Sequence, residues 1–134
     1  LPDVIDLYGD ASRTYFTAER LRREIYCAVY VDGRIASAAG THVRSQDAQV
    51  AAVGNVLTRM PYRGRGMATS VTSAVTEAAL TEHRDVVLNV REDNSVAIAV
   101  YERLGYRPHA RFVEGPAVRR APWERITNIW RKQS

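Results

Sequence analysis

The stretch that decides the fold reads NVLTRMPYRGRGMA and covers residues 55–68. It joins the apolar run Val50–Thr58, typical of a strand buried on both faces, to a segment whose apolar residues recur at helical spacing. Pro61 lies between them and stops strand pairing because it has no N–H to donate. The helical positions are Met67, Val71, Ala74, Val75, Ala78 and Ala79. The sequence therefore predicts a strand, a short loop with two glycines, and a helix.

This loop has the chemistry of a phosphate-binding turn. A helix N-terminus presents unpaired N–H groups and a partial positive charge, which suits phosphate. Gly64 and Gly66 allow close backbone approach, and Arg63 and Arg65 add charge that phosphate can pair with. The Gly-Lys-Ser/Thr end of a P-loop and the third glycine of a dinucleotide loop are both missing. The turn therefore indicates a phosphate-rich ligand of another class.

A second motif, DNSVAIAVYERLGY, covers residues 93–106. We expect Ser95 to cap a helix here and Gly105 to follow its C-terminus. The inner face of that helix would be Ala97, Val100, Tyr101 and Leu104.

Together the two motifs resemble those of the GNAT acetyltransferase superfamily. Its cofactor motif, Arg/Gln-x-x-Gly-x-Gly/Ala, is matched at every position by residues 63–68. Its second motif is matched by Asn94, Ala97, Tyr101, Glu102, Leu104, Gly105 and Tyr106. The resemblance implies that acetyl-CoA is the acyl donor, with its pyrophosphate on the backbone amides of the turn. The cofactor-binding residues that it implies are Val56, Leu57, Thr58, Arg63, Gly64, Arg65, Gly66, Met67, Ala68, Thr69, Asn94 and Tyr101.

The resemblance covers roughly residues 26–115, and within it two stretches are similar to one branch of the superfamily. Residues 39–43 (AGTHV) and 51–56 (AAVGNV) resemble glycine N-acyltransferases, which often have a degenerate copy of the domain in front. The chain starts at Leu1 rather than Met, so it could be the C-terminal part of a longer chain. The usual first strand of the superfamily is not recognisable before the first helix.

The reaction implied by the resemblance is direct attack of a neutral primary amine on the thioester, and it gives the catalytic groups three tasks. Tyr101 is the candidate to protonate the leaving thiolate, although core packing would also explain it. His42 and Glu114 are the candidates for the base, and Glu114 could instead bind the substrate amine. A backbone N–H near Leu57 would stabilise the oxyanion. Asn55 and Asn89 could orient substrate or satisfy local backbone groups.

The pattern of elements predicts a single α/β (α+β) domain over residues 1–134, with a mixed, mostly antiparallel sheet and flanking helices. We expect a helix at 18–24 after the N-cap Thr17 and a hairpin that turns at Asp32 and Gly33. Residues 44–49 read as a loop. The strands are expected at Tyr26–Val31, Arg34–Val43, Val50–Thr58, Val86–Val90, Tyr106–Val113 and roughly Ile126–Trp130.

Composition narrows the function classes. The chain has 46% hydrophobic residues and a formal net charge of +4, with scattered arginines and one lysine. We find no nucleic-acid motif, metal-ligand cluster or membrane-length apolar run. A single cysteine, Cys27, excludes an internal disulfide and fits the cytoplasm; we interpret it as a core thiol, with a nucleophile as the alternative.

The expected partners are acetyl-CoA and a small-molecule or peptide amine, with no nucleic acid and no membrane, and the chain could form a homodimer. The acceptor itself cannot be read from the sequence. Two other hypotheses stay open. A non-catalytic CoA-binding module of a larger protein would keep the turn, and a nucleic-acid-binding protein would need a contiguous basic face.

Overall fold

The fold is described by a computed structural model, which places residues 1–113 and 115. A four-stranded sheet has the order β1 (Tyr26–Val31), β2 (Arg34–Ser45), β3 (Val50–Thr58) and β4 (Asp85–Leu88). The first two pairings are antiparallel, and β3 pairs with β4 in parallel. The helices are α1 (Pro2–Tyr8), α2 (Ala18–Arg23), α3 (Met67–Leu80) and α4 (Ser95–Arg103), with 3-10 turns η1 (Asp10–Thr14) and η2 (Met60–Tyr62). The predicted mixed α/β class is confirmed.

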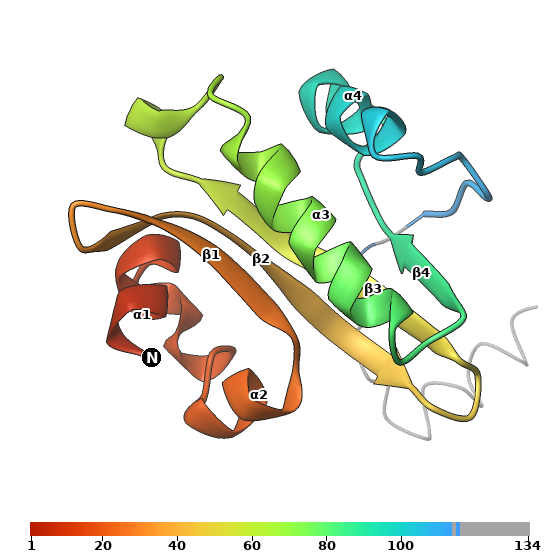
Figure 1. The fold of residues 1–134 in the computed structure, drawn as a ribbon, viewed down its shortest axis with the longest axis horizontal. Coiled ribbons are helices and arrows are strands. Elements are labelled where there is room, and N and C mark those ends of the chain that lie inside the picture. Colours follow the sequence, from red (N-terminus) through yellow and green to blue (C-terminus); the bar gives the residue numbers. More distant parts are fainter. Residues whose placement is uncertain (114, 116–134) are drawn as a thin grey trace, which may run out of the picture.

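Helices pack on both faces of the sheet. Val71 and Val75 of α3 pack on Ala39 and Val53, and Figure 1 shows α3 crossing in front of β2 and β3. Leu7 of α1 packs on a second cluster that contains Ala38 and Leu57. Successive strand residues such as Ala38 and Ala39 point to opposite faces, so α1 covers the face that α3 leaves open.

The local sequence signals place several elements as predicted. Thr17 caps α2 by accepting a hydrogen bond from the N–H of Arg20 at 3.1 Å. Asp32 and Gly33 have φ of 48° and 76°, the positive values that a tight hairpin turn requires. The bounds predicted for β1 and β3 match the structure. In contrast, β2 continues to Ser45, two residues into the predicted loop.

Three predictions at the other end of the chain were wrong. Residues 106–113 form no strand, because Pro108 supplies no N–H and the segment is largely exposed. The strand β4 ends at Leu88, not Val90, because its pairing with β3 stops at Val53. Asn94, not Ser95, caps α4 by accepting from the N–H of Ala97 at 3.1 Å. The strand predicted near residues 126–130 lies outside the described residues.

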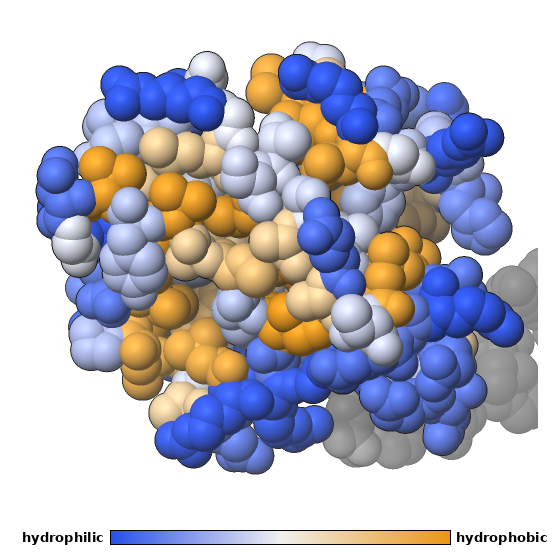
Figure 2. All heavy atoms as spheres, viewed as in Figure 1, coloured by the Kyte–Doolittle hydropathy of each residue, from blue (hydrophilic) through white to orange (hydrophobic). Residues whose placement is uncertain are grey.

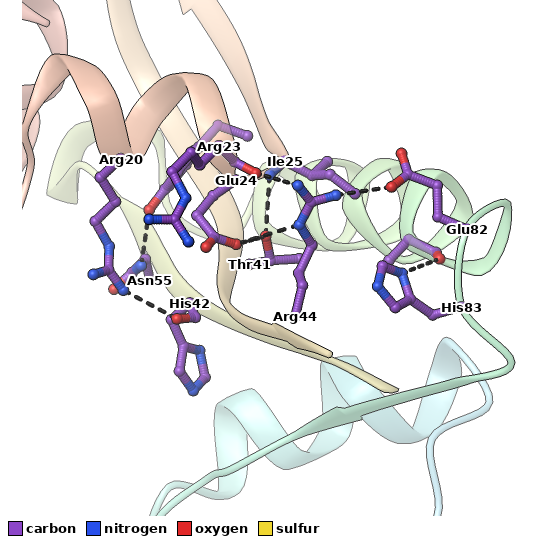
Figure 3. A network of polar contacts seen from close by, with 12 residues as sticks. Arg20, Arg23, Glu24, Ile25, Thr41, His42, Arg44, Asn55, Glu82 and His83 are labelled. Carbon is purple, nitrogen blue, oxygen red and sulfur yellow. Dashed lines mark hydrogen bonds and ion pairs between the residues drawn. The ribbon is translucent and has the colours of Figure 1, made fainter. Parts of the chain in front are cut away.

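A polar network joins the ends of α2 and α3 to β2 (Figure 3). The fully buried Thr41 hydroxyl donates to Glu24 at 2.7 Å and accepts from the N–H of Ile25 at 3.0 Å. Arg44 pairs with Glu82 at 2.9 Å and lies 3.6 Å from Glu24. Most polar atoms of this junction bond to one another, although among the described residues the buried Arg44 Nε has no hydrogen-bond partner and only the ion pair with Glu24. We interpret the junction as an anchor of the fold and assign it no ligand. None of the described helices is long and apolar enough to cross a lipid bilayer.

Candidate acyl-CoA site

The predicted turn between β3 and α3 adopts a conformation that exposes backbone N–H groups. Gly64 and Gly66 have φ of 73° and 77°, and no atom lies within 4 Å of where either would bear a Cβ. Gly66 is the N-cap of α3, and no side chain caps that helix. The first intrahelical bond comes from Ser70 to Gly66, so the N–H groups of residues 67–69 precede the helical ladder. These donors and the helix dipole suit an anion.

Arginines around the turn divide into paired and available ones. Arg34 and Arg59 both pair with Asp6, at 2.9 and 2.6 Å, and the hydrogen bond from Arg34 is the main reason that the pKa of Asp6 is lowered. Arg63 uses its Nε to hold the carbonyl of Thr58 at 3.1 Å, and Arg65 lies over the Tyr62 ring at 5.7 Å. Neither makes an ion pair with any described residue. Arg63 and Arg65 can therefore face a phosphate.

The strand before the turn has an open edge. The register of β3 with β4 ends at the pair Val53 and Leu88, while β3 continues alongside β2 to Thr58. Within the described residues, the outer edge of residues 54–58 has no neighbouring strand. A pocket of about 520 Å³ lies on the α1 side at the C-terminal end of β3, and its walls are Leu7, Arg34 and residues 57–63. Along the chain, the open edge leads directly into the glycine turn.

The register also shows which N–H faces the open edge. Arg59 donates to the carbonyl of Ala36 on β2, so by alternation Leu57 also pairs with β2 through Ala38. By the same alternation, the N–H groups of Val56 and Thr58 point the other way, toward the open edge. The oxyanion donor near Leu57 stays a prediction, and in this register Val56 and Thr58, rather than Leu57, turn an N–H to that edge.

The comparison with protein families bears on this geometry. The family model described as "FR47-like protein" matches residues 30–113, which is more than half of the 134-residue chain. The chain belongs to the FR47-like family. The match spans both glycine-turn and second-motif segments, and with the solved structures described next it confirms the predicted GNAT resemblance.

Solved structures show the same fold for this FR47-like chain. A GNAT-family protein from Novosphingobium aromaticivorans is 28% identical with a TM-score of 0.65, over 79% of this chain and 47% of that one. The aminoglycoside N-acetyltransferase AAC(6')-Iy in complex with CoA is 16% identical with a TM-score of 0.70, over 88% and 92%. A Trypanosoma brucei acetyltransferase is 22% identical with a TM-score of 0.64, over 75% of each chain. A search of the curated proteins found no match.

The second motif places Tyr101 on the α3 side of the FR47-like domain. Its half-buried ring lies 6.1 Å from that of Tyr106, whose hydroxyl bonds to Thr76 of α3 at 2.7 Å. Burial, and next the proximity of Tyr106, raise the pKa of Tyr101. Packing and a protonated hydroxyl thus coexist at this residue. The side-chain oxygen of Asn94 accepts the hydrogen bond that caps α4. The N–H groups of its side-chain amide are therefore the atoms that could contact a ligand.

His42 lies on the other face of the sheet. It is the extra residue of a bulge in β2, between Thr41, which pairs with Val53, and Val43, which pairs with Ala52. Its ring lies against Gly54, where a Cβ would come within 2.6 Å of Nδ1. Figure 3 shows Arg20 reaching past Asn55 to the His42 backbone, and its guanidinium donates to the His42 carbonyl at 3.0 Å. His42 and Tyr101 therefore approach the sheet from opposite sides.

Sequence reasoning missed a tyrosine cluster beside His42. The amide of Asn55 donates to the hydroxyls of Tyr15 and Tyr26, at 3.2 and 3.3 Å, and the Tyr8 hydroxyl donates to the Asn55 carbonyl. These residues come from separate segments, so no local sequence pattern joins them. The one available signal is the helical spacing of Val4, Ile5 and Tyr8 after Pro2, which is typical of a helix at the position of α1. Glu114, the other predicted base, lies outside the described residues. Asn89 is exposed.

The polarity of the surface on the α3 side bears on the hypothesis of nucleic-acid binding. Figure 2 shows hydrophobic residues interspersed with hydrophilic ones on the α3 side, so this side has no unbroken charged face. A nucleic-acid-binding protein would need a contiguous basic surface. Among the described residues, no three His, Cys, Asp or Glu side chains gather where they could hold a metal ion. The turn and the open edge are the features that indicate a ligand.

Proposed function

We propose that this protein is an N-acyltransferase that moves the acetyl group of acetyl-CoA to a primary amine. The observation that carries the proposal is the continuity of the uncapped α3 N-terminus with the open edge of β3. One end offers backbone donors for phosphates, and the other offers a strand edge that an extended, amide-containing arm can pair with. CoA has both parts in that order.

The residues of the turn would hold the pyrophosphate. The N–H groups of residues 64–69 are the donors, and the side chains of Arg63 and Arg65 supply positive charge. Val56, Leu57 and Thr58 would lie along the pantetheine arm. Thr58 contributes backbone rather than its hydroxyl, because that hydroxyl is 2.8 Å from the Ser37 hydroxyl and buried. The thioester supplies an activated acyl group, so the protein needs only to position and polarise it.

The chemistry divides between the two faces of the sheet. The N–H of Val56 is the donor that would stabilise the oxyanion as the amine attacks. Tyr101, from the α3 side, would protonate the sulfur of the leaving thiolate. His42, from the α1 side, would take the proton of the ammonium directly or through water, and Glu114 is the second candidate. The acceptor amine would then enter on the His42 side.

The proposal specifies a primary amine as the acceptor and no narrower class. The solved structures with this fold include an aminoglycoside N-acetyltransferase and a glucosamine-6-phosphate N-acetyltransferase from Arabidopsis thaliana, so one fold serves different acceptors. The glycine N-acyltransferase branch stays a prediction, because the matches concern the superfamily. A cytoplasmic location would suit the free Cys27.

The test has two stages. Calorimetric titration should give a micromolar Kd for acetyl-CoA and far weaker binding of NAD. Thiol release from acetyl-CoA is then measured with glycine, glutamine, spermidine, an aminoglycoside and a tetrapeptide with a free N-terminus. Amine-dependent release supports the enzyme. Tight binding with no release across the panel would favour the non-catalytic CoA-binding module, and equal affinity for NAD would overturn both readings.

A further inference from the structure

Asn55 holds an unusual backbone conformation at the start of the open edge. Its φ is 53°, one of three positive values among the described non-glycine residues. Between the pairs Gly40 with Gly54 and Ala38 with Leu57, β3 has one residue more than β2. Asn55 and Val56 therefore share the position opposite Ala39 and form a bulge. Such a conformation persists only where the surroundings hold it.

Three tyrosines hold the bulge. The Tyr8 hydroxyl donates to the Asn55 carbonyl, and the Asn55 amide donates to Tyr15 and Tyr26. Burial raises the pKa of Tyr8, so its hydroxyl stays protonated and able to donate. Phe16 is 4% exposed and stacks on Tyr8 with ring centres 4.5 Å apart. The cluster therefore has a rigid aromatic base beneath the bulge.

Arg20 fixes the third side of the cluster. Its guanidinium lies 4.1 Å from the centre of the Tyr15 ring and donates to the Tyr15 hydroxyl at 3.0 Å. The same group holds the His42 carbonyl. A single set of contacts thus links α1, α2, the β2 bulge at His42 and the β3 bulge at Asn55.

We propose that Asn55 is a positioning residue for acyl transfer, held by Tyr8, Tyr15 and Tyr26 so that the β3 bulge aims the N–H of Val56 at the open edge. The inference rests on the proposed function and adds a residue to it. Asn55 does not itself reach the reacting atoms, because its carbonyl and its amide are both committed to tyrosines. It acts through the neighbouring peptide.

The bulge decides the direction of the Val56 N–H. Without the extra residue, the register would advance by one, and alternate N–H groups would exchange the β2 side for the open side. A donor displaced by about 1 Å can cost on the order of 100-fold in rate. Asparagine is one of the few residues that tolerates a positive φ and also offers an amide to bond with.

The experiment compares Asn55→Ala with Asn55→Gly in the full chain. Alanine is strained at positive φ, whereas glycine keeps that backbone and loses only the amide. Gln49→Ala is the matched control, because Gln49 has φ of 55° in the hairpin before β3 and its side chain bonds to Gln46 rather than to the tyrosine cluster. We measure acetyl-CoA Kd, melting temperature, and kcat for thiol release with the fastest amine of the panel above. The backbone ¹⁵N–¹H resonance of Val56 in the free protein is the readout that does not depend on turnover.

We expect Asn55→Ala to lower kcat at least tenfold and to shift the Val56 resonance, with acetyl-CoA Kd changed less than threefold. Asn55→Gly should keep more activity than Asn55→Ala, and Gln49→Ala should lower the melting temperature without lowering kcat. The inference would be overturned if Asn55→Ala lowered the melting temperature but not kcat, or if kcat were equal in all variants. Either result would leave the proposed function intact. An inactive wild type would instead overturn the proposed function and the inference with it.

Discussion

The imidazole of His42 lies against Gly54, so closely that a Cβ on Gly54 would come within 2.6 Å of the His42 Nδ1. Gly54 pairs with Gly40, and the unpaired His42 lies two residues further along β2, in the bulge. The position needs glycine for the close approach of a ring to a backbone, not for its own dihedral angles.

Gly54→Ala should therefore destabilise the protein by about 1–3 kcal/mol, because the ring must move out of a packed site. His42→Ala removes the obstacle, so the double variant should be less unstable than the sum of the single changes. Urea unfolding of the four forms measures the coupling. Additive free energies would show that the two residues do not contact each other.

Tyr101→Phe should lower kcat by on the order of 100-fold while acetyl-CoA affinity stays nearly unchanged, since only the hydroxyl is lost. The ring would still pack against Tyr106. A smaller effect would follow if the CoA thiolate leaves readily without help. Wild-type kcat at saturating acetyl-CoA in the phenylalanine variant would remove Tyr101 from the mechanism.

The pH dependence gives Tyr101 a second test. A general acid must be protonated, and burial raises the pKa of Tyr101 above its ordinary value of 10.0. The acid form is therefore present at neutral and mildly alkaline pH and is lost only above pH 10. The pH profile of kcat should show no loss due to this group below that value. A descending limb under pH 9 that disappears in Tyr101→Phe would contradict the assignment.

Cys27 should behave as a core thiol. Burial raises its pKa, which lowers the fraction of reactive thiolate, and the partly buried side chain packs against the core cluster of Ala39, Val53, Val71 and Val75. Alkylation by iodoacetamide at pH 8 should be slow in the folded protein and fast in urea. Cys27→Ala should keep kcat, because the proposed reaction forms no covalent enzyme intermediate. A tenfold loss of kcat with an unchanged melting temperature would revive the nucleophile alternative.

The cap of α4 allows a simple stability comparison. Asn94→Ala removes the acceptor for the Ala97 N–H and should cost about 1 kcal/mol. Ser95→Ala changes the first residue inside the helix and should cost far less. Urea unfolding of both variants distinguishes them, and a larger loss for Ser95→Ala would reverse the assignment of the cap.

Local signals explain which parts of the fold could be predicted. The Asp32-Gly33 turn needs only positive φ at two residues, and α3 shows its own periodicity, so both could be read from neighbouring residues. The early end of β4 could not, because it depends on where the pairing with β3 stops. The missing strand at 106–113 shows the same limit, since a strand needs a partner as well as a pattern.

The site divides in the same way. The glycine turn is contiguous in sequence and its two positive φ values are there in the structure. The contacts of Asn55 join residues 29 to 47 positions apart, so its tyrosine partners had no signal in a single sequence. The backbone donor near Leu57 could be predicted only in part. The sequence predicts the strand, but which of its N–H groups face the open edge depends on the register with β2.

The most direct test of the account is acetyl-CoA binding by Gly66→Asp beside Gly33→Asp. Both glycines have nearly the same positive φ, 77° and 76°, with open space at the Cβ position, so the backbone strain is matched. At the N-cap of α3, an aspartate can bond the same N–H groups that phosphate needs and repel the phosphate as well. Calorimetry should show that Gly66→Asp loses acetyl-CoA binding while Gly33→Asp keeps the wild-type Kd. Unchanged affinity in a folded Gly66→Asp variant would contradict the assignment of the turn to the cofactor.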